Sequence, residues 1–194
     1  MTPIKAARWM WGLFVWIVLA VPAFAQTVDL LGAPGPIVLD GKSFELAWSA
    51  QPSGNYRKQE YVPAGQSVDH YDQMVMLERV TGGLKVIDAV SGQMDMLENR
   101  KRTDPLVRFE VLQKNARDEV DFDFLVSGRD ARGDPMVEWN LYRYLPTASG
   151  VLLFAISHRA YGNEAVKTFL GELSQLRSAQ TGMFLQTPVP DLAD

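Results

Sequence analysis

Two histidines are the residues with the widest chemical range in this sequence. His70 stands in the run Asp69-His70-Tyr71-Asp72, so two carboxylates and an imidazole lie within four positions. These groups can ligate a divalent metal if a loop brings them together, but the second histidine that a zinc site would use is not nearby. The run is therefore interpreted as an exposed or capping polar cluster, with metal binding as the alternative. His158 ends an apolar run and is interpreted as a hydrogen-bonded histidine at a strand end.

Three carboxylates in strand-like runs could pair as a general acid and a general base: Asp121, Asp123 and Glu138. The simpler interpretation is that they lie on solvated strand faces. The aromatic residues Trp139, Tyr142 and Tyr144 could likewise line a groove, although packing against a helix or strand is the expected role.

Several classes of chemistry are excluded or unsupported. The 194 residues include no cysteine, which rules out a thiol nucleophile, a cysteine zinc site and a cysteine-linked lipid. The sequence has no Gly-x-Ser-x-Gly elbow and no phosphate loop. With a net charge of −4, the chain lacks the basic character of nucleic-acid-binding proteins. No cofactor is predicted.

Most of the candidate residues named above lie in the stretch Val107–His158, whose pattern predicts four successive strands. Apolar and polar residues alternate in the first three, whereas the run Val151–Ile156 is apolar throughout and predicts a strand covered on both faces. Short connections favour antiparallel neighbours. A helix over about 163–178 follows, with Asn163 as its expected N-cap.

Earlier in the chain, Ile37–Trp48 predicts a hairpin that turns at Asp40-Gly41, or one strand with a lead-in. Tyr56–Val62 predicts a strand, and residues 67–79 fit a helix and a strand equally well, with a short helical turn before a strand at Gln73–Arg79 preferred. A long helix is expected over about 84–102. The fold class predicted is α+β, with an antiparallel sheet of about five to seven strands and two helices.

The N-terminus has the three parts of a secretory signal peptide. Lys5 and Arg8 precede an apolar run, and Ala23-Phe24-Ala25 provides small residues for cleavage after Ala25. An uncleaved anchor is the alternative, but the run is shorter than the ~20 residues of a spanning helix. Cleavage would leave 194 − 25 = 169 residues with a net charge of −4 − 2 = −6. The expected product is a soluble bacterial protein without a membrane span, periplasmic or secreted.

The domain organisation expected is a signal peptide at 1–25, a flexible lead-in at 26–36, one domain at 37–180 and a tail at 181–194. The segment Tyr61-Val-Pro-Ala-Gly-Gln-Ser67 resembles a Tyr-x-Pro-x-Gly-(Gln/Glu)-(Ser/Thr) segment of small exported bacterial proteins of unassigned function. The order of elements over roughly Ser43 to Arg177 also resembles the PsbP-like α/β/α sandwich. That resemblance implies an accessory or binding module and carries over no catalytic residues.

The hypothesis that follows is a non-enzymatic envelope protein that binds a partner protein or a small ligand. A hydrolase with a carboxylate and histidine site and a purely structural component are the alternatives. A histidine within hydrogen-bond reach of an aspartate would favour the hydrolase, and a flat apolar patch with a polar rim would favour partner binding. The candidate surface lies in the segment 61–72 and comprises Tyr61, Pro63, Gly65, His70 and Asp72.

Overall fold

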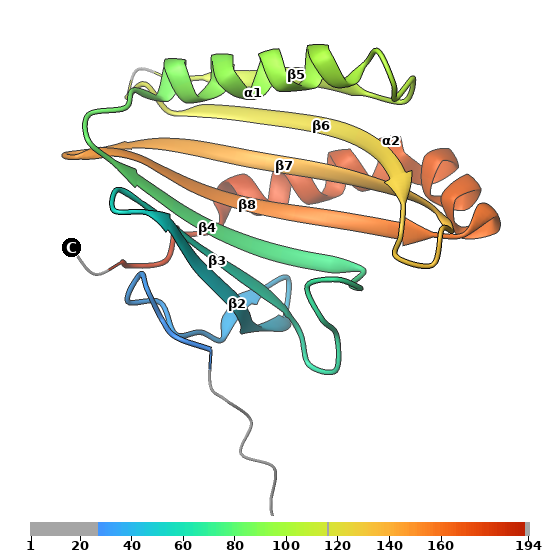
Figure 1. The fold of residues 1–194 in the computed structure, drawn as a ribbon, viewed down its shortest axis with the longest axis horizontal. Helices are drawn as coiled ribbons and strands as arrows, with labels where there is room; N and C mark the ends of the chain where they lie inside the picture. The colour runs from blue at the N-terminus through green and yellow to red at the C-terminus, as the bar shows by residue number, and fades with distance from the viewer. Residues whose placement is uncertain (1–26, 116, 193–194) are drawn as a thin grey trace, which may run out of the picture.

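The computed structural model describes residues 27–115 and 117–192, so the predicted signal peptide lies outside the described residues. One eight-stranded sheet dominates the fold, and two helices pack on it (Figure 1). The elements in chain order are β1 (Ile37–Leu39), β2 (Lys42–Ser53), β3 (Tyr56–Pro63), β4 (Gln73–Thr81), α1 (Val86–Arg100), β5 (Arg108–Lys114), β6 (Val120–Arg129), β7 (Pro135–Thr147), β8 (Gly150–Tyr161) and α2 (Asn163–Gln186).

The sheet consists of two antiparallel runs that meet in its middle. Its strand order is β1-β2-β3-β4-β8-β7-β6-β5, and every neighbouring pair is antiparallel. The predicted four-strand meander is confirmed as β5 to β8. The hairpin prediction is also confirmed, because β1 and β2 are joined by Asp40 and Gly41, both with positive φ. Strand β8, which contains the apolar run Val151–Ile156, lies between β4 and β7, and side chains of this run are buried in the cores on both faces of the sheet.

The two helices lie on opposite faces of the sheet, with α1 along β5 and β6 and α2 behind β7 and β8 (Figure 1). Because side chains alternate along each strand, each face has its own core. On the α1 face, Val86, Val90 and Leu97 of the helix pack against the sheet. On the α2 face, Phe184 is the fully buried helix residue, and Trp139 and Phe154 lie beneath it in the same core.

The predicted fold class, α+β with about five to seven strands and a long first helix, is wrong. The protein is mainly an eight-stranded antiparallel sheet. A count of seven corresponds to the alternative in which Ile37–Trp48 is one strand with a lead-in, whereas the three residues of β1 form a separate strand. The first helix is also the shorter one, with 15 residues against 24 in α2.

Asp104 fixes the turn in which the chain leaves α1 and returns to the sheet. Its buried carboxylate accepts hydrogen bonds from the Ser127 N–H at 2.7 Å, the Ser127 hydroxyl at 2.6 Å and the Arg100 Nε at 3.1 Å. Burial alone would raise the pKa of Asp104, but these hydrogen bonds outweigh it and hold the pKa below its ordinary value. The turn after α1 is thereby attached to β6.

Both predicted flexible segments are ordered where the structure describes them. Within the expected lead-in, Leu31 and Ala33 are buried, and the Tyr61 hydroxyl donates to the Ala33 carbonyl at 2.6 Å. The expected tail begins inside α2, because the helix continues to Gln186 to bury Phe184. Helix α2 begins after Gly162, which replaces Asn163 as the N-cap. Before β4, residues 67–70 form an isolated β-bridge instead of the preferred helical turn.

Candidate ligand-binding site

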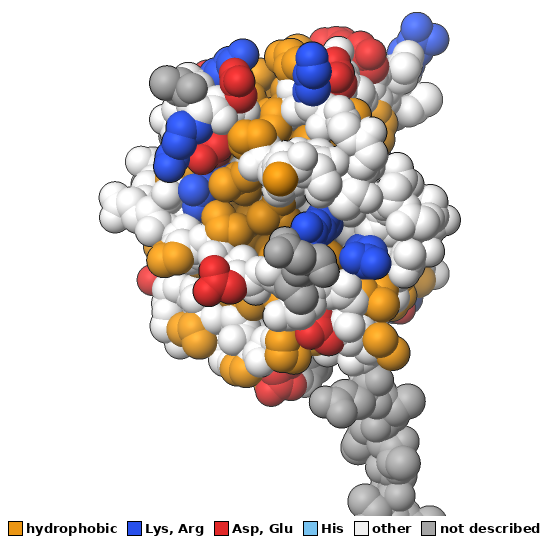
Figure 2. Space-filling view, turned by 90° about the vertical axis from the view of Figure 1, so that its left-hand side faces the viewer, with side chains coloured by type: hydrophobic (Ala, Val, Ile, Leu, Met, Phe, Trp, Pro, Cys, Tyr) orange, Lys and Arg blue, Asp and Glu red, His pale blue; other side chains and the backbone are white. Residues whose placement is uncertain are grey.

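A hollow of about 330 Å³ opens at the end of the molecule where α1 begins. It lies between the start of α1, the β7–β8 turn and the β5–β6 connection. Figure 2 faces this end of the molecule and shows hydrophobic side chains gathered in a hollowed area, with both basic and acidic side chains around it. The lining consists of Gly83, Leu84, Lys85, Val86, Ile87, Lys114, Asp118, Val120, Pro146, Thr147, Ala148, Ser149 and Gly150.

Close backbone approach fixes the shape of the hollow. Gly150 pairs with Thr81 across β4 and β8, and a Cβ at Gly150 would lie 2.1 Å from the Val80 carbonyl oxygen. Only glycine fits there. The Gly83 N–H donates to the Ser149 carbonyl at 2.9 Å, which ties the segment before α1 to the β7–β8 turn. The hollow is therefore held by main-chain contacts rather than by flexible side chains.

The floor is apolar and the rim is mostly cationic. Val86 and Val120 are almost completely buried, whereas Ile87 is 54% exposed. Lys114 pairs with Asp118 at 3.5 Å, and both of these side chains are largely exposed. Within the described chain, Lys85 has no hydrogen-bond or ion-pair partner for its ammonium group, and the buried Oγ1 of Thr147 has no hydrogen-bond partner. This arrangement suits a small amphipathic ligand.

The structure does not bring the five predicted surface residues together on one face. Tyr61 is fully buried on the α2 face, where its hydroxyl accepts a hydrogen bond from Gln59 at 2.6 Å. Pro63 is the last residue of β3, and Gly65 lies in the turn that follows, with a φ of +82°. His70 is exposed and its ring centroid lies 4.1 Å from that of Tyr161, while Asp72 accepts a hydrogen bond from Gln66 at 2.7 Å.

His158 is the more unusual histidine because it is buried under α2. The Gln73 side-chain amide nitrogen lies 3.3 Å from each ring nitrogen, and Trp139 packs beside the ring. Burial is the main cause that lowers the pKa of His158 to about 4, and the nearby Lys42 adds to the decrease. A hollow of about 370 Å³ next to it is lined by both acidic and basic side chains. No histidine–carboxylate hydrogen bond occurs among the described side chains.

The three candidate carboxylates each pair with an arginine, so the expectation of solvated strand faces is wrong. Asp121 lies 3.8 Å from Arg143, and Asp123 accepts a 2.6 Å hydrogen bond from Arg177 of α2. Glu138 lies on the opposite face from these two and accepts a 2.6 Å hydrogen bond from the Nε of Arg159. The acid–base pairing is not formed. The buried Trp139 confirms packing as the role of that ring.

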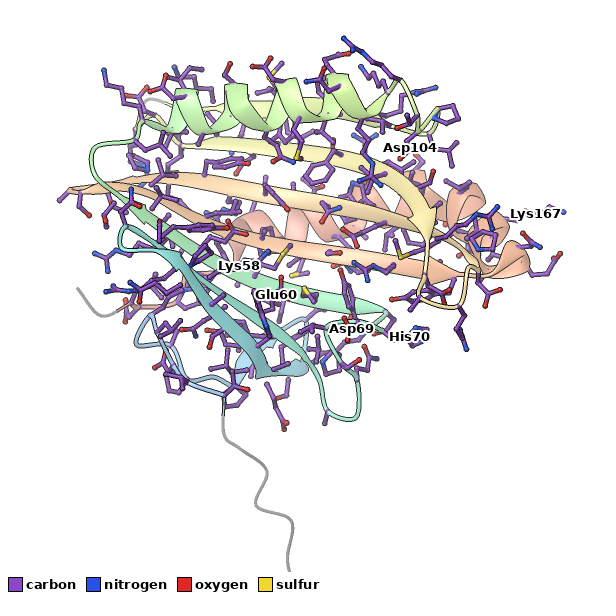
Figure 3. The ribbon with its side chains drawn as sticks, viewed as in Figure 1. Lys58, Glu60, Asp69, His70, Asp104 and Lys167 are labelled. Carbon is purple, nitrogen blue, oxygen red and sulfur yellow. The ribbon has the colours of Figure 1, made fainter. Side chains whose placement is uncertain are left out.

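A polar cluster on the α1 face was not identified from the sequence. Lys58 of β3 lies 2.9 Å from Glu60 and 3.2 Å from Glu78 of β4, and Figure 3 shows Lys58 and Glu60 side by side on β3. The Tyr56 hydroxyl donates to Glu78 at 2.7 Å. Burial would lower the pKa of Lys58, but the two carboxylates outweigh it and raise that pKa. The alternation along Tyr56–Glu60 shows in the sequence that these side chains share a face of β3. The sequence does not show that β3 pairs with β4, which brings Glu78 to them.

Metal and membrane sites were also considered for the described residues. No group of three or more histidine, aspartate or glutamate side chains could hold a metal ion in that part of the chain. No helix there has the length and apolar character needed to cross a membrane.

Comparisons with known proteins give one match. A model of a protein family whose function is not characterised matches residues 31–188, which include the whole sheet and both helices. Curated proteins and solved structures gave no match, so the PsbP-like resemblance stays a prediction.

Proposed function

We propose that this chain, which belongs to the protein family matched over residues 31–188, is an exported, non-catalytic binding module that holds a small apolar or amphipathic ligand in the hollow at the start of α1. The hollow carries the proposal. Its apolar floor is formed by buried residues of α1 and β6, Val86 and Val120, and its mouth is open. Its volume lies at the lower end of the roughly 300–1,000 Å³ typical of ligand pockets.

The hydrolase alternative receives less support. That mechanism needs a base that is oriented by a carboxylate. His158 instead contacts the neutral amide of Gln73, and His70 stacks against Tyr161. Two of the candidate acid–base carboxylates, Asp123 and Glu138, lie on opposite faces of the sheet, and each is paired with an arginine.

Filling the hollow is expected to abolish ligand binding. Ala148 is an exposed residue of the β7–β8 turn, so Ala148→Trp places an indole in the hollow without changing the core. We expect saturable binding of the uncharged fluorescent probe N-phenyl-1-naphthylamine to the unmodified protein, and at least about tenfold weaker binding to A148W, equivalent to about 1.4 kcal/mol. Fluorescence titration measures both.

Met96→Trp is the matched control, because Met96 is 52% exposed on α1 and does not line the hollow. It adds the same indole elsewhere and should bind the probe like the unmodified protein. Equal affinities for A148W and the unmodified protein would contradict the proposed site.

Export is the second part of the proposal, and it rests on residues 1–25 of the sequence. Expressed in a bacterium with its own N-terminus, the protein is expected to be processed after Ala25 and recovered from the periplasm or the medium. Intact-mass spectrometry of the recovered protein locates the cleavage site. A full-length mass in the cytosolic or membrane fraction would contradict export by cleavage, and substitution of Ala25 by a bulky residue should block processing.

A further inference from the structure

We infer that the ligand of this hollow is anionic, namely a linear acyl carboxylate whose head group lies at Lys85 and whose chain lies on the apolar floor. This inference rests on the proposed function, because it assigns a ligand class to the same hollow. Three features of the lining support it, namely the form of its apolar surface, the sign of its charge and the hydrogen-bond donors close to Lys85.

The apolar surface extends from the rim to the floor. Leu84 and Ile87 lie at the start of α1 near the rim, and Val86 and Val120 form the buried end. Pro146 and Ala148 complete the side formed by the β7–β8 turn. Among the described residues, no aromatic ring lines the hollow, so that lining offers no surface for stacking a planar ligand. Aliphatic walls of this kind fit an alkyl chain, whose burial contributes roughly 0.8 kcal/mol per methylene.

The charge of the lining is opposite to that of the whole chain. Its ionisable residues are Lys85, Lys114 and Asp118, which give 2 − 1 = +1, whereas the chain has a net charge of −4. Asp118 pairs with Lys114, so Lys85 is the lysine of this lining whose ammonium group has no partner among the described residues. A positive site on an acidic protein favours an anion over a neutral or cationic head group.

Hydrogen-bond donors close to Lys85 favour the same head group. The N–H groups of Val86 and Ile87 open α1 and have no acceptor among the described residues, and no side chain caps this helix. The buried hydroxyl of Thr147, which also lines the hollow, has no partner there. A carboxylate has two oxygens that accept several hydrogen bonds, so it can satisfy the two N–H groups together with the ammonium group.

Three ligands with the same chain and different head groups test the inference. Dodecanoate, dodecanol and dodecyltrimethylammonium are titrated below their micelle concentrations, with displacement of N-phenyl-1-naphthylamine as the readout. We expect dodecanoate to bind about tenfold more tightly than dodecanol and the cation to bind most weakly. The advantage of dodecanoate should shrink as the salt concentration rises, because the charges are near the surface.

Two lysine variants then locate the head group. Lys85→Gln should weaken dodecanoate about three- to fivefold, in the range of an exposed charge pair, and leave dodecanol unchanged. Lys167→Gln removes the same charge from α2, at the far end of the molecule in Figure 3, and should change neither affinity.

Each outcome has a separate meaning. If dodecanol binds as tightly as dodecanoate, the anionic ligand class is overturned while the binding site stands. If none of the three ligands displaces the probe, and the probe itself does not bind, the proposed function fails as well. If Lys85→Gln and Lys167→Gln weaken dodecanoate equally, the attraction is a property of the whole surface, and the assignment of the head group to Lys85 is overturned.

Discussion

Replacing Asp123 with alanine is expected to lower the free energy of unfolding by about 1–3 kcal/mol. The Asp123 carboxylate is almost completely buried, and one of its oxygens accepts hydrogen bonds from Trp139 Nε1 at 3.1 Å and from Arg177 Nε at 2.6 Å. Alanine would leave the buried indole N–H without an acceptor and remove the ion pair that fastens α2 to β6. Urea unfolding followed by circular dichroism measures the change.

Glu110→Gln is the matched control, because the same Arg177 also pairs with Glu110, at 3.2 Å. The Glu110 side chain is 63% exposed, so this change should cost less than about 1 kcal/mol. Similar losses in the two variants would show that burial of Asp123 does not determine its contribution.

The second large effect expected is a loss of stability in acid that depends on His158. The pKa of this buried imidazole falls to about 4, from an ordinary value of 6.5. The folded state therefore favours the neutral ring, and the associated stability is complete above pH 6.5. It is lost as the pH falls towards 4, by about 3 kcal/mol in total, because the unfolded chain takes up the proton first.

The comparison of two histidine variants isolates this effect from carboxylate titration. Lys42, Asp72 and Arg159 lie around the same hollow and stay in place in both variants. His158→Gln should flatten the dependence of the unfolding free energy on pH between 6.5 and 4.5. His70→Gln, at the exposed histidine, should retain the slope of the unmodified protein. An unchanged slope in His158→Gln would assign the acid sensitivity to other groups.

Local patterns in the sequence predicted the strands and turns well. Alternation in the stretch from Val107, the apolar run Val151–Ile156 and the Asp40-Gly41 turn all correspond to observed elements. These features depend on residues that are close in sequence, so the physics that determines them is visible there. Two boundaries differed, at Gln186 and in the lead-in, because Phe184 and Leu31 become ordered only by packing on the sheet.

The candidate site could not be predicted from local sequence patterns, because it depends on pairing between strands that are distant in the sequence. Gly150 and Val120 belong to different hairpins, and Lys85 comes from a third segment. None of them forms a motif alone. The same limitation explains the error about Asp123, since an acidic residue in a strand looks solvated until its arginine, 54 residues away, is known. Tyr61 looked like a surface residue because its motif is polar and turn-rich, although its ring is core.

The β4–β8 pairing also determines when folding can finish. In the described chain, the other six strand pairings join consecutive strands, whereas this one closes a loop containing residues 82–149. Closing a long loop costs entropy before its contacts contribute, so we expect this step to limit the folding rate. Strand β8 emerges late in synthesis, and until then the first four strands lack the neighbour that covers β4. A chain of this topology stays incompletely folded until nearly all of it is available, which is compatible with the export proposed above.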